Sequence, residues 1–220
     1  MIITIDGPAG AGKGTLSAFV AQKYKLAYFD TGMVYRAVGL QMVIDKADLN
    51  DVQYAEKIAQ QLTFPQMMKL AKNKDFRSDV GSHAASVVSA YPEVRAALLK
   101  MQQDFALNPV FADGTPASGV VYDGRDTGTV ICPDADLKFY ITAPVEVRAE
   151  RRCRDLVAAG FNTNYETVLA EMKARDARDM QRSSAPLSKP LGAVEIDTSL
   201  KPTEQNMADM AKIINEKFGF

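Results

Sequence analysis

Residues 2–15 read IITIDGPAGAGKGT, and this stretch decides the fold. The β-branched, mostly apolar run 2–5 is typical of a buried strand. A glycine-rich turn follows, and beyond Lys13 apolar residues recur at helical spacing, which predicts a helix starting there. Strand, glycine loop and helix in this order are the context of a phosphate-binding loop, in which Gly7, Gly12 and Lys13 fill the GxxxxGK pattern.

The residue types of this loop predict an anion site. Glycines let the backbone come close to an anion, and several N–H groups then lie at the positive end of the helix dipole. Lys13 adds a charge for the β and γ phosphates. The general motif has Ser or Thr straight after the lysine, but here Gly14 stands there and Thr15 follows. A glycine turn without a ligand is the alternative, which the flanking strand and helix disfavour.

Composition sets limits on the class of protein. With 220 residues, 47% hydrophobic and 24% charged, the chain is long enough for one substantial core. The net charge of −1 gives no basic field for nucleic acid. No apolar run could span a membrane, and no signal-peptide pattern is present. The two cysteines, Cys132 and Cys153, have no metal-binding spacing and are typical of reduced thiols, so we expect a cytoplasmic protein.

Strands and helices alternate along the rest of the chain, which predicts an α/β fold with a parallel sheet and helices on both faces. Four further strands are predicted, at residues 26–29, 119–123, 137–142 and 193–197. The long helical stretch between the second and third strands is too large for one crossover and predicts a subdomain. Within it, residues 63–78 carry little pattern and are predicted to form a loop or small insertion.

Four clusters outside the loop combine charges with glycines or helical spacing. They are FDTGMVYR at 29–36, HAASVVSAYPEVR at 83–95, YDGRDTGT at 122–129 and RDARDMQR at 175–182. Arg125 beside Asp126 follows a predicted strand, where sheets of this type bind ligands. Each cluster also has a simpler interpretation: a capped helix start, a surface loop or a solvated charged helix. His83, the only histidine, has no partner in the sequence and is interpreted as a surface residue.

Together these stretches resemble the bacterial cytidylate kinase family. The matching pieces occur in family order and are IDGPAGAGKGT, DTGMVYRAV, HAASVVSAYPEVRAAL, DGRDTGTVICPDADLKFYITA, RAERR and RDARDMQRSSAPL. The resemblance implies a P-loop kinase with a five-stranded parallel sheet flanked by helices, a helical subdomain that binds the nucleoside monophosphate, and a small lid. It covers one domain, residues 1–220. The implied boundaries are a core at 1–30, 106–147 and 183–220, the subdomain at 31–105, and the lid at 148–182.

The resemblance also implies an activity. It is transfer of a phosphoryl group from ATP to CMP or dCMP, giving CDP or dCDP, in pyrimidine nucleotide metabolism. Mg²⁺ is the implied cofactor, held through the ATP phosphates, with Thr15 or Asp123 as candidates to orient it through water. We expect small-molecule substrates, no nucleic acid or membrane partner, and a monomer.

Roles for individual residues follow from the same resemblance. The implied catalytic residues are Lys13, Arg36, Arg125 and Arg175. The implied ATP-binding residues are Gly7, Pro8, Ala9, Gly10, Ala11, Gly12, Lys13, Gly14, Thr15, Arg148, Arg151 and Arg152. The implied CMP ligands are Tyr35, Arg36 and Arg125 at the phosphate, Thr31, Arg95, Asp126 and Arg182 at the base, and Ser86, Arg175 and Asp179 at the sugar.

Two alternatives are weighed against this hypothesis. One is a UMP/CMP kinase or another P-loop kinase of a small molecule. The other is a GTP-binding switch protein, which needs a guanine-reading NKxD and a switch DxxG. Residues 73–76 read NKDF, and no glycine of the chain has Asp three residues before it. The switch protein is therefore disfavoured.

Overall fold

A computed structural model describes all 220 residues. The chain divides into two compact units. The first unit contains residues 1–29, 108–181 and 185–220, and the second contains residues 30–107 and 182–184. The predicted lid, residues 148–182, belongs mostly to the first unit by its contacts. Its boundaries, and those of the core and the subdomain, stay predictions about movement on ligand binding.

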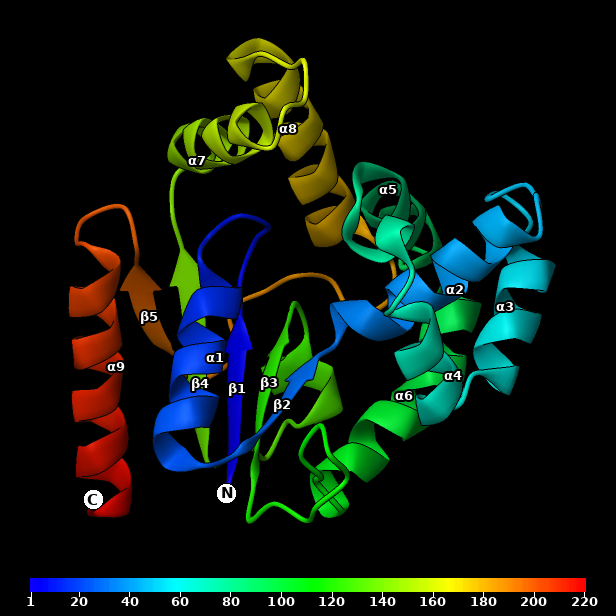
Figure 1. Cartoon of the computed structure of the whole chain (residues 1–220). Helices are drawn as coiled ribbons and strands as arrows, with labels where there is room; N and C mark the ends of the chain where they lie inside the picture. Colours follow the sequence, from blue (N-terminus) through cyan, green and yellow to red (C-terminus); the bar gives the residue numbers. More distant parts are fainter. The chain divides into compact units, whose positions relative to one another are not determined.

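A five-stranded parallel sheet organises the first unit, which confirms the predicted α/β fold. The strands are β1 (Ile2–Asp6), β2 (Ala27–Asp30), β3 (Val120–Gly124), β4 (Leu137–Thr142) and β5 (Val194–Asp197). Their order across the sheet is β2-β3-β1-β4-β5, with β1 at the centre (Figure 1).

The strand register brings the carboxyl ends of the strands to one edge. Asp6 pairs with Gly124 of β3 on one side. On β4 and β5, Thr142 pairs with Asp197. The glycine loop after β1 and the segments after β3, β4 and β5 therefore begin side by side. This is the edge at which parallel α/β sheets bind ligands.

Helices cover the sheet because their apolar stripes bury against it. α1 (Lys13–Tyr24) and α9 (Thr203–Phe218) lie side by side on one face (Figure 1). Leu16 and Val20 of α1 and Met210 of α9 join the apolar strand residues in one buried cluster. α7 (Val145–Ala158) and α8 (Tyr165–Gln181) pack on each other around a smaller cluster that includes Ala149 and Met172.

The second unit is helical. It contains α2 (Gly32–Ile44), α3 (Val52–Gln61), α4 (Phe64–Leu70), a 3₁₀ helix (Lys74–Arg77), α5 (Asp79–Val88) and α6 (Pro92–Leu107). α2 and α5 are in extensive contact, and Gly39 of α2 allows it. A Cβ at Gly39 would lie 2.7 Å from the backbone of Ala84, so a larger residue would force the helices apart.

The prediction of a loop at residues 63–78 is wrong. α4 begins there with a capping box, in which the Thr63 hydroxyl accepts from the Gln66 N–H and the Gln66 side chain accepts from the Thr63 N–H. Pro65 fits the first turn of this helix. Met67 and Phe76 are 2% and 1% exposed, and this burial fixes the segment. The helix is short, so its apolar period was too brief to recognise.

Two connecting segments complete the fold. A short π-helical turn, Thr127–Ile131, follows β3 and was not predicted. The loop of residues 108–118 closes on itself through a bridge between Val110 and Pro116. None of the helices combines the length and apolarity that a membrane span requires.

Candidate active site

The glycine loop turns tightly against the sheet. A side chain at Gly7 would overlap the carbonyl oxygen of Ile141 on β4, and Gly7 has a φ of 149°. Gly10 and Gly12 also have positive φ, 75° and 88°. Only glycine adopts such backbone geometry without strain. The loop then enters α1 directly at Lys13, so the N-terminus of this helix opens onto the loop.

Lys13 is buried beside other charges of the first unit. Its Nζ donates to the Pro8 carbonyl oxygen at 2.8 Å. Burial lowers the pKa of Lys13 to about 7, the positive charges of Arg125 and Arg175 add to this, and Asp123 opposes it. Two predicted catalytic arginines are thus close enough to repel the charge of Lys13. A bound polyphosphate would relieve that repulsion and restore the full charge of the lysine.

Arg125 and Asp179 form a pair at the same edge of the sheet. Arg125 Nε donates to Asp179 Oδ2 at 3.0 Å, and its Nη1 donates to the Gly124 carbonyl oxygen at 3.0 Å. Asp126, the next residue, is 4% exposed and starts the π-helical turn. The predicted motif GRDT therefore places one guanidinium and one carboxylate at the end of β3, and α8 adds the carboxylate of Asp179.

Asp6 supports this turn and was missed in the sequence. Its carboxylate accepts from the Thr127 and Gly128 N–H groups at 2.8 and 2.7 Å. Burial raises the pKa of Asp6 to about 6, although these two N–H donors oppose the rise. A Cβ at Gly128 would lie 2.8 Å from Thr4 Oγ1, so glycine is needed there for close packing. Part of the GRDTGT motif thus has a structural role.

The arginines of α7 contact protein groups near the loop. Arg148 donates to the carbonyl oxygens of Ala9 and Ala143 and pairs with Asp176 of α8. Arg151 donates to the hydroxyl and the carbonyl oxygen of Thr198, which follows β5. The third predicted ATP ligand of this helix, Arg152, is exposed.

In the second unit most of the predicted CMP ligands lie on α2, α5 and α6, while Thr31 precedes α2 and Arg182 follows α8. Arg95 stacks its guanidinium over the ring of Tyr35, with 5.1 Å from Cζ to the ring centroid, and donates to the Ser89 carbonyl oxygen at 3.2 Å. Arg36 pairs with Asp30 at 3.8 Å. Three further predicted ligands belong to this unit: Thr31 and Ser86, both buried, and Arg182, which is half-buried.

The structure thus distributes the predicted ligands over both units. The first unit brings Lys13, Arg125, Arg175 and Asp179 to the loop, with Asp123 and Asp126 beside them in β3 and the turn after it. The roles of these residues toward ATP and CMP stay predictions.

Sequence reasoning missed three residues of the first unit: Asp6, Asp176 and Thr198. Each lies buried at or near a strand end or on a charged helix. A charged residue that ends an otherwise apolar strand, as Asp6 does, is the signal that could have been used.

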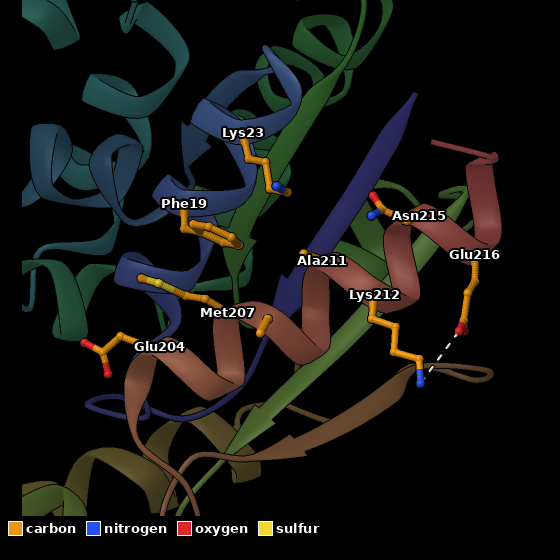
Figure 2. Close-up of a pocket in the computed structure, with 9 residues that line it drawn as sticks. Phe19, Lys23, Glu204, Met207, Ala211, Lys212, Asn215 and Glu216 are labelled. Atoms are coloured by element: carbon orange, nitrogen blue, oxygen red, sulfur yellow. Dashed lines mark ion pairs between the residues drawn. The ribbon is translucent and has the colours of Figure 1, made fainter.

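The groove between α1 and α9 lies elsewhere in the first unit. Figure 2 shows Phe19 and Lys23 on α1 facing Met207 and Ala211 on α9, with the Lys212–Glu216 pair at its rim. None of the residues predicted to bind nucleotide lines it. The glycine loop is therefore the candidate active site.

The chain is similar to known proteins over nearly its whole length. The family model for cytidylate kinase matches residues 3–216. Cytidylate kinase of Rhodospirillum rubrum is 45% identical over 217 residues, covering 99% of this chain and 98% of the relative. Cytidylate kinase of Paramagnetospirillum magneticum is 44% identical and covers 98% of both chains.

A solved structure extends the comparison to the fold. The crystal structure of an uncharacterized protein from Eubacterium ventriosum has a TM-score of 0.53 at 13% identity and covers 98% of each chain. At that identity it supports the fold alone. The family match and the curated relatives extend over nearly the whole length, and the chain belongs to the cytidylate kinase family.

Proposed function

We propose that this protein transfers the γ-phosphoryl group of ATP to CMP and dCMP, giving CDP and dCDP. The observation that carries the proposal is Lys13 at the glycine loop, whose pKa is lowered to about 7, first by burial and then by the nearby positive charges of Arg125 and Arg175. A cluster of this kind fits a ligand with several negative charges. The named relatives are cytidylate kinases, which points to CMP as the acceptor.

Catalysis of this reaction needs placement and charge neutralisation rather than a covalent intermediate. The proposed donor site is residues 7–15, whose N–H groups hold the ATP phosphates. Lys13 and Arg175 stabilise the charge that spreads over the transferred group. Arg125 holds the phosphate of CMP in line with it. No general base is needed in this scheme.

Mg²⁺ is the proposed cofactor, and the residues present fit it. The chain holds no group of three or more His, Cys, Asp and Glu side chains for a metal, so the ion would bind mainly through ATP oxygens. A Cβ at Gly14 would lie 3.6 Å from Asp123 Oδ2, so this carboxylate reaches the place where the general motif has a hydroxyl ligand. Asp123, or Thr15, would hold the ion through water. Bound Mg²⁺ neutralises charge on the phosphates.

Ten residues are proposed as ligands of the acceptor. In the second unit these are Tyr35 and Arg36 for the phosphate, Ser86 for the sugar, and Thr31, Arg95 and Arg182 for the base. In the first unit they are Arg125 for the phosphate, Asp126 for the base, and Arg175 and Asp179 for the sugar. The arginines Arg148, Arg151 and Arg152 are assigned to the ATP side.

A coupled assay of ADP release tests the proposal against its alternatives. CMP, dCMP, UMP, AMP and shikimate are offered in turn with ATP and Mg²⁺. We expect turnover with CMP and dCMP at well above the rate with UMP. Equal rates with UMP and CMP would favour a UMP/CMP kinase, and turnover only with another acceptor would overturn the proposal.

We further propose a role in pyrimidine nucleotide metabolism, as a monomer in the cytoplasm. Only two cysteines are present, both free, which fits a reducing compartment. Sedimentation at several concentrations tests the monomer, which predicts one species near the chain mass of 24.0 kDa.

A further inference from the structure

The guanidinium of Arg148 forms hydrogen bonds with protein groups in and around the phosphate loop. Its Nη1 donates to the Ala9 carbonyl oxygen at 3.0 Å, and its Nε donates to the Ala143 carbonyl oxygen at 2.8 Å. Its Nη2 donates to Asp176 Oδ2 at 2.6 Å. The side chains of Arg148 and Asp176 are 5% and 12% exposed. The guanidinium is therefore held in one orientation, with the Ala9 carbonyl as one of its fixed partners.

Thr198 makes an equivalent contact farther along the loop. Arg151 Nη1 donates to the Thr198 hydroxyl at 3.0 Å, and Arg151 Nη2 donates to its carbonyl oxygen at 2.7 Å. The hydroxyl has one proton. It lies 3.0 Å from the Ala11 carbonyl oxygen and 3.4 Å from that of Thr142, so donation to Ala11 is favoured.

These contacts fix the N–H groups of the loop. In a trans peptide the C=O and the following N–H lie in one plane and point in opposite directions. A carbonyl of Ala9 held toward Arg148 therefore turns the Gly10 N–H away from it. Likewise, an Ala11 carbonyl held toward Thr198 turns the Gly12 N–H away. The two N–H groups are thereby directed away from α7 and β5.

Stability alone is a poor reason for this network. A buried ion pair often contributes little, because desolvation offsets its attraction. Here Asp176 Oδ1 is buried and has no hydrogen-bond partner, which adds a further cost. Met172 of α8 also lies on the loop, because a Cβ at Gly10 would be 2.9 Å from its Cε. The contacts converge on the loop rather than on the core.

We propose that Asp176, acting through Arg148, and Thr198, acting with Arg151, are positioning residues for the phosphate loop. They hold the peptides that end in Gly10 and Gly12 so that both N–H groups face a bound polyphosphate. The inference rests on the proposed function only in taking ATP as the natural ligand. The α7 arginines would then act on ATP through the loop backbone as well as by any direct contact.

Thr198→Val gives the first test, with Thr198→Ser as the matched control. Valine keeps the shape but removes the hydroxyl, and serine restores it. Affinity for ATP and for tripolyphosphate is measured by titration calorimetry well below the unfolding temperature. We expect valine to weaken both ligands by about 3- to 10-fold, the effect of one lost hydrogen bond, and serine to bind as the wild type does. The KM for CMP should not change.

Asp176→Asn gives the second test, because it keeps the shape and removes the charge that orients Arg148. Its control is Asp209→Asn, which breaks the exposed pair with Lys201 far along the chain. We expect Asp176→Asn to raise the KM for ATP by about 3- to 10-fold without changing that for CMP, and the control to change neither. A role in stability alone would lower the melting temperature and leave tripolyphosphate affinity unchanged, which would overturn the inference.

Failure of this inference is distinguishable from failure of the proposed function. A wild type that binds tripolyphosphate but does not phosphorylate CMP would refute the function, while the two variant series would still test the loop. A wild type active on CMP, with variants that bind tripolyphosphate normally, would refute the inference alone. If the wild type binds neither ATP nor tripolyphosphate, both are refuted.

Discussion

Each compact unit holds an arginine–aspartate pair, and two of these pairs differ in length and in exposure to water. In the first unit Arg148 and Asp176 pair at 2.6 Å, with 5% and 12% of their side chains exposed. In the second unit Arg36 and Asp30 are 3.8 Å apart, with 19% and 16% exposed. Short buried contacts fix a geometry, whereas longer ones in contact with water leave side chains able to adjust. The Arg148–Asp176 pair is therefore held more firmly than the Arg36–Asp30 pair.

Replacing Lys13 with methionine should have the largest effect on activity. The change removes the buried cation at the loop, and loss of one preorganised charge typically costs about 10²–10³ in rate. The stability of the variant should not fall with its activity. Because burial lowers the pKa of Lys13 to about 7, the unfolded chain binds the proton more tightly, and the free energy of unfolding rises with pH above 7.

The measurements are the kcat for CMP phosphorylation and the melting temperature at pH 7 and pH 9. We expect Lys13→Met to melt at or above the wild-type temperature at pH 7, with a smaller advantage at pH 9. Lys23→Met, on the exposed end of α1, is the control. A folded Lys13→Met enzyme with near-normal kcat would refute the role of this lysine.

Asp6 provides the opposite pH dependence. Burial raises the pKa of this carboxyl to about 6, above its ordinary value of 3.8. The folded protein therefore binds the proton more tightly, so this contribution to stability is present below pH 3.8 and is lost as the pH rises through about 6. The shift corresponds to at most about 3 kcal/mol.

Urea unfolding at pH 4.5, 6 and 7.5 measures this effect. As the pH rises across this range, the free energy of unfolding of the wild type should fall relative to that of Asp6→Asn. In the variant the NH₂ group of asparagine would face one of the backbone N–H groups of Thr127 and Gly128, donor against donor. The variant should therefore be less stable than the wild type at low pH. Parallel pH profiles of wild type and variant would contradict the predicted titration.

The sequence predicted the phosphate loop and the five strands well because both are local patterns. The loop needs only residues 2–15, and each strand is an apolar run bounded by turn residues. The prediction failed at α4, where the Thr63–Gln66 capping box was present in the sequence but the helix is short. Local signals therefore predict an element when it is long or strongly patterned.

Residues that support the site were harder to predict because their partners are distant in sequence. Asp6 binds the backbone of Gly128, 122 residues away, and Thr198 binds that of Ala11, 187 residues away. The residues next to Asp6 and Thr198 in the sequence do not predict these partners. The family resemblance supplied candidate ligands but not the contacts that hold the phosphate loop.

Specificity for the base gives a prediction of intermediate size. Asp126 is 4% exposed, and a carboxylate accepts from the cytosine amino group. Uracil would present an oxygen there, and an unpaired buried acceptor costs about 1–3 kcal/mol, or roughly tenfold or more. Asp126→Ala should therefore lose most of its activity on CMP and much less on UMP.

The quantity to measure is kcat/KM for CMP divided by that for UMP, in wild type and variant. Asp179→Ala, which changes a proposed sugar ligand, is the control. It should lower kcat/KM for CMP and for UMP by the same factor. An unchanged ratio in Asp126→Ala would mean that Asp126 does not read the base. It would then be assigned to support of the neighbouring Arg125.

The smallest effect is expected at Arg77, an exposed residue of the second unit. Arg77 lies 3.6 Å from Asp30, yet 66% of its side chain is exposed, so water and salt screen the pair. Arg77→Gln should change the free energy of unfolding by less than about 1 kcal/mol and the KM for CMP by less than about threefold. Arg36→Gln removes the less exposed partner of the same carboxylate, and should raise that KM by about tenfold or more if Arg36 binds the CMP phosphate. The two variants share Asp30 as a partner, but only Arg36 is a proposed ligand, so a KM that is higher in Arg36→Gln than in Arg77→Gln indicates phosphate binding. Equal KM values would mean that Arg36 only pairs with Asp30, and the acceptor phosphate would have to be assigned to Arg125 and Tyr35.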